Sequence, residues 1–184
     1  VNLIMDSFAA LALATEPPTD SLLLRKPDNR DAPMITPTMW KHMIGHAIFQ
    51  SILLLYLTLL PGGSLVFGLA ESGTRHHYTA VFNTFVCLNV FNKFNARKIN
   101  DELNIFEGIA DSHMSHYIIL IIVVGQFLIV QYGGDWTQTH PLSQHQWLVS
   151  LAIGLLSLPL GFLLRLLPNP TTTIANTPAT KKSS

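Results

Sequence analysis

Charged residues are scarce in this sequence of 184 residues. Only 12% are Asp, Glu, Lys or Arg, against 48% hydrophobic residues, whereas a soluble domain carries about 25% charged residues. The composition therefore argues against an ordinary soluble domain. Acidic and basic residues are equal in number, with 11 of each, and we expect no nucleic-acid partner.

Other common signals are missing as well. The single cysteine, Cys87, can form no disulfide within the chain, so it does not indicate a redox compartment. No repeat of the 20 to 50 residue kind that marks a solenoid is visible. A signal peptide does not fit the start, because a basic region is lacking and Asp6 interrupts the apolar stretch. The chain opens at Val1 without a start methionine or an N-cap, and we interpret it as part of a longer polypeptide.

The sequence contains several long apolar segments. Three runs approach or reach the roughly 20 residues that a bilayer core requires, and each is followed by proline or glycine: 40–60, 117–130 and 147–167. A fourth segment, 78–95, is apolar but carries four asparagines, so we interpret it as a membrane helix that faces other helices. The sequence therefore predicts an integral membrane protein.

The opening segment supplies a fifth helix, over residues 1–16, which ends at Pro17 and Pro18 because proline cannot continue the helical hydrogen bonds. A polar loop over 17–39 follows. The predicted fold is all-α, a five-helix transmembrane bundle whose other four helices lie within 40–168, at about 40–60, 78–95, 115–132 and 147–167. The remaining 169–184 are rich in Pro, Thr and Ser, and we expect a disordered tail.

The basic residues are distributed unequally among the connections. All except Arg75 lie in the loops 17–39 and 96–114, in the tail, or near the helix ends that adjoin them. Cytoplasmic loops of membrane proteins carry the excess of Lys and Arg. We therefore expect a multi-pass protein in which both loops and the tail are cytoplasmic.

Asn2 and Asp6 are the strongest candidates for a functional site. They lie four residues apart, on one face of the first helix, and a carboxylate inside a membrane span costs about 2.5–3.5 kcal/mol on insertion scales. Such residues usually line a pathway, and hard cations such as Ca²⁺ take oxygen ligands. The alternative is that Asp6 lies near a helix end and reaches water.

Two other groups of residues are weaker candidates. The asparagines of 78–95 could extend an ion pathway, with Asn89 as a ligand, although hydrogen bonding between helices is the commoner role of Asn in a bundle. His42 and His46 are four residues apart and could bind zinc, but no third ligand accompanies them. We favour an interfacial position for both histidines.

Several segments together resemble one known family. "VNLIMDSFAALALATEPP", "FNTFVCLNVFNKFNARKINDELNIFEGI", "VQYGG" and "PLSQHQWL" occur in the order and spacing of the membrane region of P-type calcium ATPases, particularly the plasma-membrane type. The resemblance covers Val1 to about Pro168 and implies that the chain contains the sixth to tenth transmembrane helices of a pump. It also implies that Asn2 and Asp6 bind the transported Ca²⁺.

The resemblance has departures and omissions that carry information. The resemblance implies that Met5 and Val86 stand where another branch of the family has ligands for a second ion, which points to one Ca²⁺ per cycle. Met5 is equally compatible with a packing or lipid-facing residue. The phosphorylated "DKTGT" sequence is absent, so ATP and Mg²⁺ would be bound by other domains of the parent pump, and this chain alone cannot hydrolyse ATP. Two alternatives stay open: a P-type pump for another cation, and a non-catalytic five-helix membrane scaffold.

Overall fold

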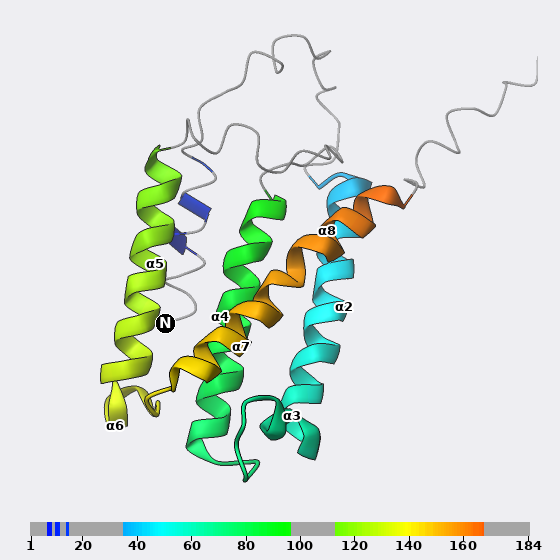
Figure 1. Ribbon diagram of the computed structural model, residues 1–184. Helices are drawn as coiled ribbons and strands as arrows, with labels where there is room; N and C mark the ends of the chain where they lie inside the picture. The colour runs from blue at the N-terminus through cyan, green and yellow to red at the C-terminus, as the bar shows by residue number, and fades with distance from the viewer. Residues whose placement is uncertain (1–6, 9, 12–13, 15–34, 97–112, 168–184) are drawn as a thin grey trace, which may run out of the picture.

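The structure is a computed structural model that describes residues 7–8, 10–11, 14, 35–96 and 113–167 (Figure 1). Every element within these ranges is a helix, and the predicted all-α fold is confirmed. The few described residues of the opening segment are helical. Most of that segment, most of the two predicted cytoplasmic loops and the whole tail, 169–184, lie outside the described residues.

Helix α2 (Pro37–Leu59) has a clear start and a clear end in the sequence. The Thr36 hydroxyl accepts a hydrogen bond from the Met39 amide at 3.2 Å, and Pro37 occupies the first helical turn, where no amide donor is needed. The helix ends before Pro61, which begins the short α3 (Pro61–Val66). With 23 residues, α2 is long and apolar enough to cross a membrane.

Helix α4 (Arg75–Ala96) is the centre of the bundle, packed against α2, α5, α7 and α8 (Figure 1). Its most extensive contact is with α7. Unusually for a central helix, many of its buried side chains are polar: His77, Thr79, Asn83, Thr84, Lys93 and Asn95. A helix of this composition needs partner groups on its neighbours, because unpaired polar groups are costly away from water.

Helix α5 (His113–Tyr132) lies on the opposite side of α4 from α2 (Figure 1). Two glycines follow it, and Gly134 has a φ of +50°, a left-handed conformation that glycine adopts without strain. This turn leads into α6 (Gly134–Thr137), a single short helical turn. The chain then reverses through Gln138, also left-handed at φ +56°.

The last membrane segment consists of two helices end to end, α7 (Gln144–Leu155) and α8 (Ser157–Leu166). Ser143 and Gln146 form a capping box at the start of α7. The sequence suggested one helix over 147–167, but the helix breaks at Leu156, because Pro159 lacks the amide that would bond to the carbonyl of Leu155. The two helices cross the bundle diagonally (Figure 1).

Small residues let α7 and α8 approach α4 closely. A side chain at Gly154 would place its Cβ 2.8 Å from the Cys87 Cβ, and one at Gly161 would collide with Asn95. Close approach through small residues is typical of helix packing in membranes. The buried small positions recur every three or four residues along this face: Ser150, Gly154, Ser157 and Gly161.

The bundle buries polar side chains beside an apolar core, and its outer faces are apolar. The core cluster consists of Leu57, Phe67, Ala80, Val130 and Leu142. Large apolar side chains are exposed on the outer faces of α2, α5, α7 and α8, with Ile52 at 65% and Leu148 at 66%. In water such a surface would be costly, but hydrocarbon solvates it. In Figure 1, α2 starts and α8 ends at one end of the bundle, whereas α3 and α6 lie at the other, called here the α3/α6 end.

Candidate functional site

The two predicted ion ligands, Asn2 and Asp6, lie outside the described residues. Their role therefore stays a prediction. The described part of the chain shows instead how the polar residues of α4 are used, and what is built at the α3/α6 end.

Two asparagines of α4 bond to neighbouring helices. Gln126 of α5 donates from Nε2 to Asn83 Oδ1 at 3.1 Å, and both side chains are buried. Asn95 donates from Nδ2 to the carbonyl of Ser157 at 2.8 Å, beside the break between α7 and α8. Arg165 in turn donates to the Asn95 carbonyl at 2.9 Å. These contacts fix the positions of α5 and α8 on α4.

Asn89 bonds within its own helix. Its Nδ2 donates to the carbonyl of Phe85 at 3.0 Å, and the side chain is half-buried. Val86, one turn before Asn89 on α4, is 3% exposed and presents only methyl groups. Neither the hydrogen bond of Asn89 nor the burial of Val86 tests whether Asn89 is an ion ligand, so that role stays a prediction.

The histidine pair of α2 finds no third ligand among the described residues. His46 is buried, and neither of its ring nitrogens has a hydrogen-bond partner. Within the described ranges, no group of three or more His, Cys, Asp and Glu side chains could hold a metal ion. A zinc site at His42 and His46 therefore has no support from the described geometry.

His77 joins α2 to α4 at the α3/α6 end. Its ring is fully buried; Nδ1 accepts from the Gly73 amide at 3.1 Å, so Nε2 carries the hydrogen and donates to the Leu57 carbonyl at 2.8 Å. That carbonyl lacks a helical partner, because its donor would be the nitrogen of Pro61. The His77 ring N–H, from α4, thus takes the place of the backbone amide that Pro61 lacks.

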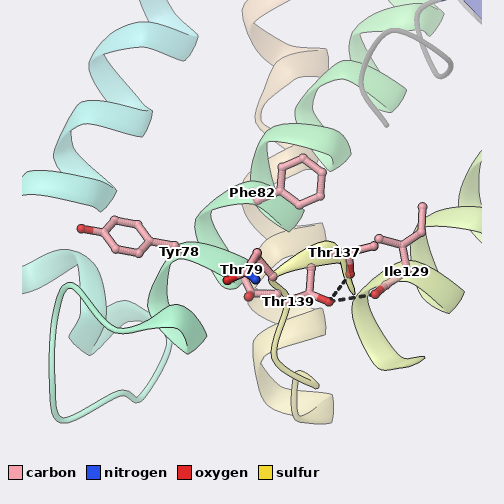
Figure 2. Close-up of a pocket in the computed structure, with 7 residues that line it drawn as sticks. Tyr78, Thr79, Phe82, Ile129, Thr137 and Thr139 are labelled. Atoms are coloured by element: carbon pink, nitrogen blue, oxygen red, sulfur yellow. Dashed lines mark hydrogen bonds between the residues drawn. The ribbon is translucent and has the colours of Figure 1, made fainter. Parts of the chain in front are cut away.

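A recess of about 380 Å³ lies between α4, α5 and α6 (Figure 2). Its walls are mostly apolar, formed by rings and methyl groups. The polar atoms of its rim bond to protein: Thr139 donates to the Ile129 carbonyl at 3.0 Å, and Thr137 therefore donates to Thr139 at 2.8 Å. The lining residues are Tyr78, Thr79, Phe82, Ile129, Thr137, Gln138 and Thr139.

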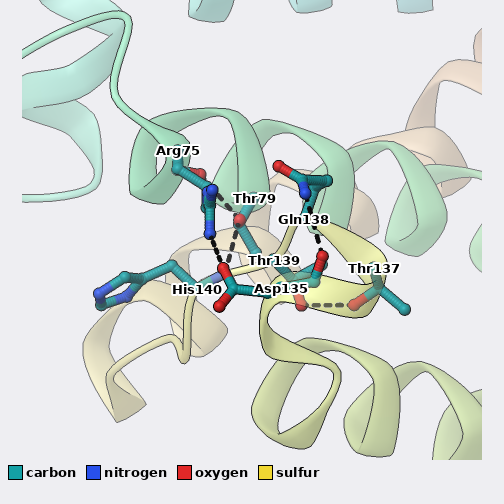
Figure 3. A network of polar contacts seen from close by, with 7 residues as sticks. All are labelled: Arg75, Thr79, Asp135, Thr137, Gln138, Thr139 and His140. Carbon is teal, nitrogen blue, oxygen red and sulfur yellow. Dashed lines mark hydrogen bonds and ion pairs between the residues drawn. The ribbon is translucent and has the colours of Figure 1, made fainter.

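A polar network adjoins this recess (Figure 3). Thr79 donates to the Arg75 carbonyl at 2.8 Å and accepts from the His140 amide at 3.0 Å. Arg75 forms an ion pair with Asp135 at 2.5 Å, and Gln138 donates to the Asp135 carbonyl at 3.0 Å. The network fastens the start of α4 to α6 and to the connection that follows it.

Sequence reasoning missed both the His77 contact and the recess. The His77 contact had half a signal in the sequence, since Pro61 after an apolar run leaves a carbonyl unpaired. The sequence does not indicate which of the several polar residues of 71–79 pairs with that carbonyl. The recess had no signal in the sequence, because it forms where α4, α5 and α6 meet, at residues distant in sequence.

The chain matches known proteins over nearly its whole length. The family model described as "Cation transporting ATPase, C-terminus" matches residues 1–167. The "Plasma membrane calcium-transporting ATPase 3" of Homo sapiens is 48% identical over 179 residues, which cover 91% of this chain and 14% of the human protein.

Other relatives come from distant organisms. The "Plasma membrane calcium-transporting ATPase 1" of Gallus gallus is 47% identical over 176 residues, covering 91% of this chain and 14% of the relative. The "Calcium-transporting ATPase 5, plasma membrane-type" of Oryza sativa subsp. japonica is 48% identical over 174 residues, covering 92% of this chain and 16% of the relative. These matches confirm the resemblance seen in the quoted segments. The chain spans about one seventh of the length of these relatives.

Proposed function

Because the chain belongs to the family of cation-transporting ATPase C-terminal domains and is an all-helical integral membrane domain, we propose that it is the C-terminal transmembrane part of an ATP-driven pump that exports Ca²⁺ from the cytoplasm. Its relatives are named for calcium transport across the plasma membrane. The observation that carries the proposal is the family match over residues 1–167, which includes the carboxylate in the opening apolar run.

Asn2 and Asp6 supply part of the ion site in this proposal. A divalent cation entering the membrane loses its hydration shell and needs oxygen ligands with negative charge. Asp6 provides the charge, Asn2 adds an amide oxygen one turn away on the same face, and helices outside this chain provide the other ligands. The cost of a carboxylate in the bilayer is offset when it faces a cation instead of lipid.

The proposed stoichiometry is one Ca²⁺ per cycle. Met5 offers a thioether, which is a poor ligand for a hard cation. Val86 is buried in the bundle and has no oxygen on its side chain. The two positions that would complete a second site in other branches of the family therefore contribute nothing to one here.

The remaining parts of the pump lie outside this chain. ATP and Mg²⁺ act at domains that carry the phosphorylated aspartate, and this chain is their membrane partner. The loops 17–39 and 96–114 and the tail face the cytoplasm in this proposal, supported by the basic residues that they contain. The α3/α6 end then faces the opposite side of the membrane.

The test is the substitution Asp6→Asn in the full-length pump. An amide keeps the shape of the side chain but removes its charge, so we expect normal membrane expression and a loss of Ca²⁺-dependent phosphoenzyme formation from ATP. Asn2→Ala should weaken Ca²⁺ affinity in the same direction. Glu71→Gln, on the exposed connection after α3, removes a carboxylate elsewhere and should change nothing. Wild-type Ca²⁺ affinity in both ion-site variants would exclude the proposed site.

The same measurement separates the two alternatives. A pump for another cation would form phosphoenzyme in response to that cation and not to Ca²⁺, and Asp6→Asn would still abolish the response. A non-catalytic scaffold would form no phosphoenzyme with any cation.

A further inference from the structure

We propose that the recess between α4, α5 and α6 binds a zwitterionic phospholipid, with one acyl chain in the recess and the headgroup over the Arg75–Asp135 ion pair. This inference requires only that the domain lies in a bilayer. It does not depend on which ion the parent protein moves.

The chemistry of the walls favours hydrocarbon as the occupant. Tyr78, Phe82 and Ile129 present apolar surface to the recess. The hydroxyls of its three threonines are all engaged in hydrogen bonds with protein atoms. A polar solute would therefore lose its bonds to water and gain few in return. The volume of about 380 Å³ is at the lower end of the roughly 300–1,000 Å³ of small-molecule sites.

The position of the recess favours a membrane lipid over another apolar molecule. Tyr78, which lines the recess, is 52% exposed, so the recess opens onto the outer face of the bundle. Trp136 of α6 is 96% exposed, and exposed Trp and Tyr are typical of the headgroup level of a membrane. The recess thus lies where the acyl chains of one leaflet meet their headgroups.

The charges at the rim select the headgroup. Thr79 and Gln138, which line the recess, bond to the carbonyls of Arg75 and Asp135, so the ion pair stands at its edge (Figure 3). The two side chains are 47% and 93% exposed. An ion pair this exposed adds little to stability, about 0–1 kcal/mol. It does present one positive and one negative group, which complement the phosphate and the ammonium of a zwitterionic lipid.

The experiment is photo-cross-linking in the full-length protein that carries this chain. The protein is reconstituted in nanodiscs of phosphatidylcholine that contain a small fraction of phosphatidylcholine with a diazirine on one acyl chain. Adducts are mapped by mass spectrometry. We expect more adducts at Phe82 and Ile129 than on the exposed apolar surface of α5 around Leu120, which lies outside the recess.

Two tryptophan substitutions on α5 provide the matched comparison. Ile129→Trp fills the recess and should reduce the adducts there several-fold. Leu128→Trp makes the same change at the neighbouring residue, which is 50% exposed and does not line the recess, and should leave them unchanged. Equal labelling in both variants, or no enrichment over the Leu120 surface, would overturn the proposal.

Two further arms test the identity of the lipid. A diazirine sterol should not label the recess, and labelling by the sterol without labelling by phosphatidylcholine would identify a different occupant. With Asp135→Asn the rim retains only the positive charge of Arg75, so an anionic phosphatidylglycerol should compete better than it does in the wild type. An unchanged headgroup preference would overturn the role given to the ion pair.

Discussion

The hydrogen bond from His77 to Leu57 makes a sharp prediction about how α2 is held to α4. His77→Leu keeps a buried side chain of comparable bulk but removes both the donor for the Leu57 carbonyl and the acceptor for the Gly73 amide. His77→Gln is the matched control, because a glutamine amide can donate to one and accept from the other.

The two lost bonds do not cost the same. Gly73 is exposed, so water replaces the ring nitrogen as its acceptor. Leu57 is 1% exposed, and Pro61 provides no amide, so its carbonyl stays unpaired. An unsatisfied buried group costs about 1–3 kcal/mol. Since 1 kcal/mol corresponds to about 2–4 °C in a protein of this size, His77→Leu should lower the unfolding temperature of the bundle by about 2–12 °C.

Cys87 provides the assay. Cys87 is 7% exposed and lies on the α4 face that meets α7, so its thiol becomes accessible only when the bundle opens. The full-length protein, with its other cysteines replaced, is heated in detergent with a thiol-reactive dye. The labelling midpoint should fall for His77→Leu and stay near the wild type for His77→Gln. Equal midpoints for wild type and His77→Leu would refute the reasoning.

Two further predictions concern packing and orientation. Gly154→Ala should destabilise the bundle by about 1–3 kcal/mol, the usual cost of overpacking, because its Cβ would lie 2.8 Å from that of Cys87. Gly125→Ala, whose Cβ would have nothing within 4 Å, should be neutral or stabilising. The same labelling midpoint compares the two variants. A cysteine introduced at Ser72 should react with an impermeant thiol reagent outside intact cells, whereas one at Lys98 should be protected; labelling at Lys98 from outside would reverse the proposed orientation.

The proposed ion site could be inferred from the sequence alone because its signal is local. A carboxylate in an apolar run is conspicuous wherever the chain folds, and Asn2 lies one helical turn from it. The phospholipid recess could not be inferred in this way. Phe82 and Ile129 are ordinary apolar residues of two helices, and only the packing of α4 beside α5 brings them together with Thr137.

The sequence by itself determined the all-α class, the membrane location and the family, because hydrophobic length and a long ordered match are properties of the chain and not of its contacts. The tertiary structure decided which helix each polar residue hydrogen-bonds to. Four asparagines in one helix look alike in sequence, yet Asn83 bonds to α5, Asn89 to its own helix and Asn95 to α8. The physical reason is that tertiary packing sets the neighbour of each amide. Gln126 of α5 lies beside Asn83, whereas Gly154, Gly161 and the break at Leu156 allow α7 and α8 to cross α4 close to Asn95.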